Sequence, residues 1–115
     1  MTLLRVLGLF ALLVVTGLDL TGPLRAQQYA ATVELVVKDK KFAPAELKAP
    51  PDKRIVIHVV NQDGAAIEFE SQSLKAEKVV AANSEAIVRV GPLKPGRYEF
   101  FDDFNQANRG TLIVE

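Results

Sequence analysis

Two pairs of carboxylates are the residues of this sequence with the clearest chemical potential. Glu68 and Glu70 lie two positions apart in a β-prone segment, so their side chains fall on one face of a strand. Asp102 and Asp103 directly follow the aromatic residues 98–101. Carboxylate oxygens suit hard or borderline cations such as ferric iron or calcium better than cuprous copper. We therefore take Asp102, Asp103 and Glu68 as the candidate metal ligands.

Each pair also has an ordinary structural interpretation. Asp side chains in a loop commonly cap nearby backbone amides, and two of them alone make a poor site for a tightly bound cation. Glu68 and Glu70 would equally suit a solvated strand face. Residue types and spacing leave both interpretations open.

Other chemistries find little support in the chain. Cysteine is absent, which removes thiol catalysis and thiolate metal ligation. The only histidine, His58, lies among Val and Ile residues, and a lone histidine without a second one nearby is more often structural than a ligand. We find no nucleophile with a base at a recognisable spacing and no phosphate-binding glycine loop. The sequence therefore predicts a protein that is not an enzyme.

The N-terminus reads as an export signal. A basic start at Arg5 precedes an almost purely apolar run over residues 6–18, which is too short to span a bilayer. The small residue Ala26 suits signal-peptidase cleavage, so we predict a signal peptide over residues 1–26 and one domain over residues 27–115. An uncleaved anchor is the alternative. No later segment is apolar for long enough to cross a membrane.

The predicted mature chain is nearly neutral. Arg5, Arg25 and Asp19 leave with the signal, so 12 Lys and Arg face 13 Asp and Glu. A net charge near −1 argues against nucleic acid as a partner.

The elements that must position these residues are short strands. Apolar residues recur at strand spacing in short runs that are separated by turn signals such as Asn61–Gly64 and Leu93–Gly96. The pattern predicts an all-β, Greek-key β-sandwich of seven to eight short strands. The strands we expect are residues 32–37, 42–47, 54–61, 67–70, 78–81, 85–90, 96–101 and 111–115.

Pro44 cannot donate to a ladder, so the strand over residues 42–47 is expected at an edge or with a bend. Residues 105–109 are polar and lead to Gly110. They are expected to form either a recognition loop or a plain connection between strands.

The order of these segments resembles that of cupredoxins. An Asn-rich turn follows a central Val/Ile strand, and a Pro-Gly turn then precedes an aromatic strand, a loop and a last strand. More narrowly, the chain resembles small periplasmic cupredoxin-like proteins associated with iron-permease and related metal-uptake systems. The motifs that carry this likeness are Phe69–Ser71, Glu77–Val80, Gly91–Gly96 and Phe100–Phe104.

The resemblance also implies where copper ligands would stand, and this chain lacks them. Blue-copper cupredoxins hold the metal with two His, a Cys and usually a Met, a donor set that suits electron transfer. Ile67 stands at the first His position, Asp102 at the Cys and Asn105 at the second His, with Asn108 or Arg109 near the Met. No type 1 copper is therefore expected. The cofactor is left open, with an iron or a copper ion as the candidates at a weak, non-blue site.

Two function hypotheses follow from the resemblance. The first is a periplasmic, non-catalytic accessory module of an iron or copper uptake system, whose partner is a membrane metal permease or another envelope protein. The second is a metal-free cupredoxin-fold module that serves as a protein-interaction or structural domain of the cell envelope.

Overall fold

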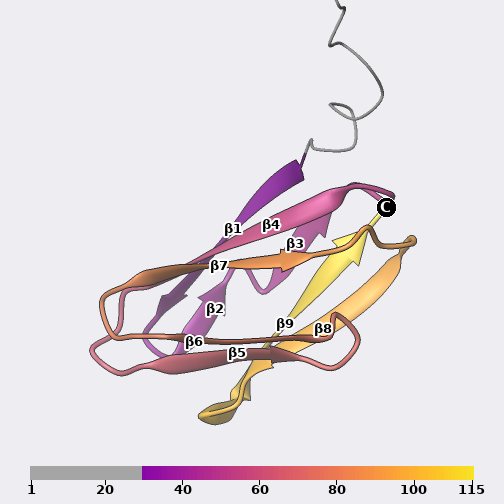
Figure 1. Ribbon diagram of the computed structural model, residues 1–115. Helices are drawn as coiled ribbons and strands as arrows, with labels where there is room; N and C mark the ends of the chain where they lie inside the picture. Colours follow the sequence, from indigo (N-terminus) through magenta and orange to yellow (C-terminus); the bar gives the residue numbers. More distant parts are fainter. Residues whose placement is uncertain (1–29) are drawn as a thin grey trace, which may run out of the picture.

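The computed structural model describes residues 30–115, which form a sandwich of two β-sheets (Figure 1). The predicted signal peptide at residues 1–26 and the start of the predicted domain lie outside the described residues. The strands are β1 (Ala30–Lys38), β2 (Lys41–Ala43), β3 (Glu46–Ala49), β4 (Arg54–Asn61), β5 (Ile67–Ser71), β6 (Ala76–Val80), β7 (Glu85–Val90), β8 (Gly96–Asp102) and β9 (Asn105–Val114).

The chain crosses repeatedly from one sheet to the other. The four-stranded sheet has the order β2-β1-β4-β7 and the five-stranded sheet has the order β3-β9-β8-β5-β6. Most neighbouring strands are antiparallel, whereas β1 pairs with β4 and β3 pairs with β9 in parallel. The all-β sandwich that the sequence predicts is confirmed.

The strand count exceeds the prediction at one place. The sequence predicted one edge or bent strand over residues 42–47, but the chain there divides into β2, which pairs with β1, and β3, which pairs with β9 of the other sheet. Pro44 lies between them. Because proline lacks the N–H that a ladder needs, the chain leaves one sheet at this point, and nine strands result.

The segment over residues 105–109 is also more regular than expected. It was predicted to be a recognition loop or a plain connection, but β9 already begins at Asn105, which is paired with Asp102, and Arg109 is paired with Phe101. The predicted strand over residues 111–115 is thus only the second half of a longer strand. A two-residue turn, 103–104, joins it to β8.

The core lies between the two sheets and is built from the alternating residues of each strand. In β4, Ile55, Ile57 and Val59 point inward while the residues between them are only partly buried. Phe100 packs edge-to-face on Phe42, with ring centroids 5.2 Å apart, and stacks on Phe69 at 5.1 Å. Such packing is the main source of stability in a chain without disulfides.

Gly110 is required by the same aromatic cluster. A Cβ atom at this position would meet the Phe100 ring and the Ala45 carbonyl. The absence of a side chain therefore lets β9 approach the ring of its neighbouring strand.

Residues 30–115 contain no helix that is long and apolar enough to cross a membrane.

Candidate functional site

Three carboxylates converge on the outer face of the five-stranded sheet. Glu68 and Glu70 come from β5, and Asp103 comes from the turn after β8. One carboxylate oxygen of each lies within 4.8 Å of the others. The amide of Asp103 donates a 2.9 Å hydrogen bond to the carbonyl of Glu68, which holds the turn against β5. We call Glu68, Glu70 and Asp103 the acidic triad.

A fourth carboxylate crowds the triad from β6. Glu77 is the register partner of Glu70 in the antiparallel β5–β6 pair. A hydrogen bond with the Glu77 carboxyl raises the pKa of Glu68 to about 7, helped by lost hydration and by the negative charges of Glu77, Asp103 and Glu70. Lost hydration also raises the pKa of Glu70, and the charges of Asp103 and Glu77 add to this. Ionising these carboxyls together is therefore costly, and a proton or a nearby positive charge is favoured here.

Asp102 takes a different role from its neighbour in the chain. Its side chain is buried, with 4% of its surface exposed. One oxygen, Oδ1, accepts 3.0 Å hydrogen bonds from the amides of Glu68 and Phe104. This is the capping arrangement that the sequence left open as the alternative to metal ligation.

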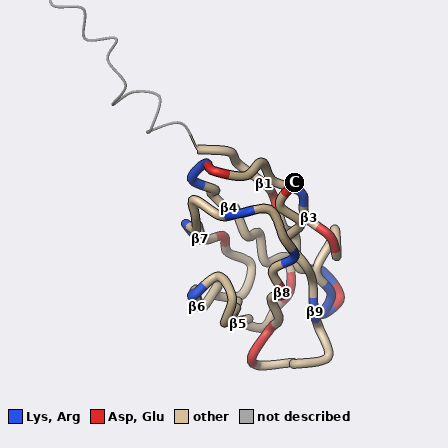
Figure 2. Tube along the Cα trace, turned by 90° about the vertical axis from the view of Figure 1, so that its right-hand side faces the viewer, with Lys and Arg blue, Asp and Glu red and all other residues tan. Residues whose placement is uncertain are grey.

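The structure therefore brings together two of the three predicted ligands. Glu68 and Asp103 meet in the acidic triad, where Glu70 joins them, whereas Asp102 is engaged by backbone amides beside it. Acidic residues mark the end of β8 and the turn that follows (Figure 2). Metal ligation by these residues stays a prediction.

Sequence reasoning missed Glu77. Nothing in its spacing relates it to Glu68 or Glu70, because the relation arises only when β5 and β6 pair in register. The available signal was its place in a charged segment, Glu77-Lys78, one short turn after β5.

A second group of polar side chains fixes the loops at one end of the sandwich. Asn61 is 1% exposed, and its Nδ2 lies 2.9–3.2 Å from the carbonyls of Ala65, Val80 and Ala81. Its Oδ1 accepts a hydrogen bond from the Asp63 amide at 3.0 Å. This one asparagine therefore links the loop after β4 to the end of β6.

Asp63 continues this network toward β1. Its two carboxylate oxygens accept 2.8 Å hydrogen bonds from the amides of Asp39 and Lys40. Asp39 and Lys40 have positive φ angles of 52° and 61°, so the carboxylate stabilises a tight turn between β1 and β2. We call this end, with Asn61, Asp63 and Asp102, the capped end.

Comparison with known proteins identifies the family. Residues 7–114 match the family described as "Cupredoxin-like domain". This chain belongs to the cupredoxin-like domain family. The match begins inside the predicted signal peptide, so the boundary at residue 26 stays a prediction.

One relative and several solved structures are similar to this chain. An uncharacterized protein of Rickettsia prowazekii is 36% identical over 94 residues, which cover 81% of this chain and 75% of the relative. The Cu(I)-bound metal-binding domain of the Cu(I)-exporting P-type ATPase CopA of Streptococcus pneumoniae D39 has a TM-score of 0.68 at 15% identity, covering 75% of this chain and 86% of that one. Auracyanin B has a TM-score of 0.63 at 18% identity, with 74% and 88% covered. At these identities the structures show a shared fold.

The cupredoxin-like chain does not offer a blue-copper donor set at the capped end. A depression of about 400 Å³ there is lined by Ile67, Asp102 and Asn105, the three positions where the resemblance places the first His, the Cys and the second His. Ile67 is 4% exposed and carries no donor atom. With neither thiolate nor imidazole, these residues do not fit type 1 copper.

The single histidine lies elsewhere. His58 belongs to β4 of the four-stranded sheet, and its Nε2 is hydrogen-bonded to Glu85 at 3.0 Å while Nδ1 lies 3.9 Å from Glu34. The acidic triad belongs to the other sheet. His58 therefore adds no donor to the triad or to the capped end.

Proposed function

We propose that this cupredoxin-like chain is a periplasmic, non-catalytic accessory module of an iron or copper uptake system, with a weak, non-blue cation site at the acidic triad. Its partner would be a membrane metal permease or another envelope protein, and not nucleic acid. Export through residues 1–26 would place it there.

The observation that carries this proposal is the convergence of three carboxylates from β5 and from the turn after β8 within 4.8 Å. All are oxygen donors, which favour hard or borderline cations. The raised pKa of Glu68, about 7, adds support because a bound cation would relieve the crowding of negative charge. The same fold occurs in copper proteins such as the Cu(I)-bound metal-binding domain of CopA.

The site proposed here would bind weakly. Asp103 is exposed, and Glu68 and Glu70 are only partly buried. A cation would therefore keep several waters, and protons would compete for Glu68 below about pH 7.

The test is elemental analysis of the protein exported from the full chain and purified from the periplasm, before and after dialysis against a mild chelator. We expect iron or copper to be retained before dialysis and lost when Glu68→Gln is combined with Asp103→Asn. The matched control, Glu34→Gln with Glu46→Gln, removes the same charge from other exposed positions and should retain the metal. A folded wild-type protein with no metal would overturn the cation site.

The second candidate function is a metal-free interaction or structural module of the cell envelope. The specific observation in its favour is that Asp102 caps two amides while Ile67 fills the space of a ligand. A metal-free, folded protein that co-purifies with an envelope protein would support this candidate instead.

A further inference from the structure

Strand β7 leaves one side of its backbone unpaired among the described residues. It is the last strand of the four-stranded sheet and pairs with β4 alone. The amide of Asn61 donates a 2.8 Å hydrogen bond to the carbonyl of Ser84, and hydrogen-bonded pairs alternate along an antiparallel ladder. Residues 86, 88 and 90 therefore direct their N–H and C=O toward β4. Glu85, Ile87 and Arg89 direct theirs toward the free edge.

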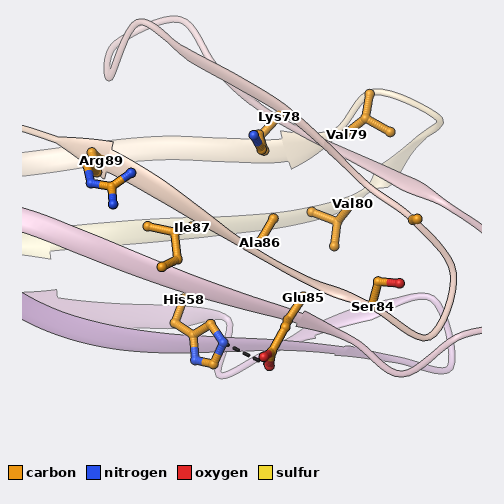
Figure 3. Close-up of a pocket in the computed structure, with 10 residues that line it drawn as sticks. His58, Lys78, Val79, Val80, Ser84, Glu85, Ala86, Ile87 and Arg89 are labelled. Atoms are coloured by element: carbon orange, nitrogen blue, oxygen red, sulfur yellow. Dashed lines mark hydrogen bonds and ion pairs between the residues drawn. The ribbon is translucent and has the colours of Figure 1, made fainter.

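The side chains of these same three residues share the outer face of the sheet. All three are exposed, and Ile87 has 44% of its surface exposed. Figure 3 shows Glu85, Ile87 and Arg89 spread along β7, with His58 hydrogen-bonded to Glu85. An apolar residue thus lies midway between an acidic and a basic one.

This arrangement is complementary to itself. If a second copy of β7 lies antiparallel across the free edge and is centred on Ile87, the two Ile87 side chains face each other. Glu85 of each copy then lies opposite Arg89 of the other. Every one of these pairs is of the hydrogen-bonded type, because all three residues direct their backbone groups outward. Opposite-charge and apolar cross-strand pairs of this kind stabilise antiparallel sheets.

The other edge strands are protected in ways that β7 is not. β2 has only three residues, and Pro44 follows directly after it. β3 has four residues, and β6, at the opposite edge of the five-stranded sheet, has five residues with Lys78 at its centre. β7 has six residues, no proline, no lysine and a continuous register with β4. Short edges, proline, lysine and bulges are the usual means of preventing edge pairing.

A hollow beside β7 extends the apolar part of this edge. It has a volume of about 610 Å³, and its lining includes Lys78 and Val79 of β6 together with Ile87 and Arg89 of β7. Val79 is 53% exposed. A strand added at the β7 edge would lie next to this hollow and reduce the exposure of both apolar residues.

We propose that β7 is a self-pairing edge through which two copies of this chain join their four-stranded sheets into one continuous sheet, antiparallel and centred on Ile87. The occupant is a second copy and not a foreign strand, because the order Glu85, Ile87, Arg89 matches its own reverse in charge. Such a contact is two-fold symmetric and closes after two copies. The proposal stands on β7 and is independent of the acidic triad.

Sedimentation equilibrium of the protein exported from the full chain tests this proposal. We expect a concentration-dependent dimer. Glu85→Arg alone and Arg89→Glu alone each place like charges opposite one another, and each should raise the dimer dissociation constant roughly tenfold or more. The double variant Glu85→Arg with Arg89→Glu restores the opposite charges and should return the constant to within about threefold of the wild type.

Two further variants make the test specific. Ile87→Lys should abolish the dimer, and thermal unfolding of that variant checks that it folds. Glu85→Gln removes the negative charge beside His58 without adding a like charge opposite Arg89, and should weaken the dimer less than Glu85→Arg. A monomer at all concentrations would overturn the proposal. A dimer insensitive to all these changes, or a stable complex with a different protein at this edge, would do the same.

Discussion

Two groups of carboxylates on this sandwich have the same chemistry and different surroundings. At the capped end, Asp63 and Asp102 each accept hydrogen bonds from two backbone amides. In the acidic triad, carboxylates face one another, and the pKa of Glu68 rises to about 7. The role of a carboxylate is therefore decided by the groups that surround it, since Asp102 and Asp103 are adjacent in the chain and belong to different groups.

The largest loss of stability is expected when the Asp102 side chain is removed. Asp102→Ala would leave the amides of Glu68 and Phe104 without their acceptor, and should lower the free energy of unfolding by about 2–4 kcal/mol. Urea denaturation measures this value. Asp103→Ala is the matched control and should change stability by less than about 0.5 kcal/mol. Equal losses for the two variants would contradict the division into two groups.

A smaller loss is expected at the other cap. Asp63→Ala removes the acceptor for Asp39 and Lys40 in an exposed turn, and should cost about 1–2 kcal/mol in urea denaturation. Asp63→Asn keeps one acceptor oxygen and should lie between the wild type and Asp63→Ala. If Asp63→Asn were as unstable as Asp63→Ala, the two hydrogen bonds would not contribute to stability independently of each other.

The acidic triad should instead affect how the free energy of unfolding depends on pH. Because the folded pKa of Glu68 lies above its ordinary value of 4.5, the folded state holds this proton more tightly than the unfolded state. Its contribution is therefore full below about pH 4.5 and is lost as pH rises toward about 7. Urea midpoints at pH 5 and pH 8 should show this decline in the wild type and a weaker one in Glu68→Gln. An unchanged slope would contradict the crowding described for the triad.

The smallest change in stability is expected for a solvent-exposed carboxylate that forms an ion pair with an arginine side chain. Glu46 lies 3.2 Å from Arg97, and both side chains are more than half exposed. Glu46→Ala should change the free energy of unfolding by less than about 0.5 kcal/mol, because water and salt screen such pairs. A loss as large as that of Asp63→Ala would show that capping is not what distinguishes the two groups.

Much of the fold could be predicted from local patterns. The bounds of β4 and β7 agree with the expected strands 54–61 and 85–90, since turn residues flank both runs of apolar residues. The prediction departs most from the structure at residues 42–47 and 105–109, whereas other strand ends differ by one or two residues. Each depends on which distant strand the segment meets, β9 for one and β8 for the other, and spacing along the chain does not record that choice.

The candidate site could be predicted only in part from the sequence. Glu68, Glu70 and Asp103 were singled out from their types and positions. The meeting of Asp103 with the two glutamates, the addition of Glu77 and the separation of Asp102 follow only from the pairing of β5 with its neighbours. The ladder is irregular between Phe101 and Asp102. Asp102 lies buried beneath the turn while Asp103 is exposed, and no residue type predicts that division.

By itself the sequence determined which chemical groups this protein can use, namely many oxygen donors, one histidine and no thiol. It also determined strands of alternating polarity, which predict a sandwich. Only the tertiary structure decided which carboxylates meet each other and which meet backbone amides. The physical reason is that strand alternation assigns a side chain to a face locally, whereas its neighbours on that face come from strands whose register is set by the packing of the whole core.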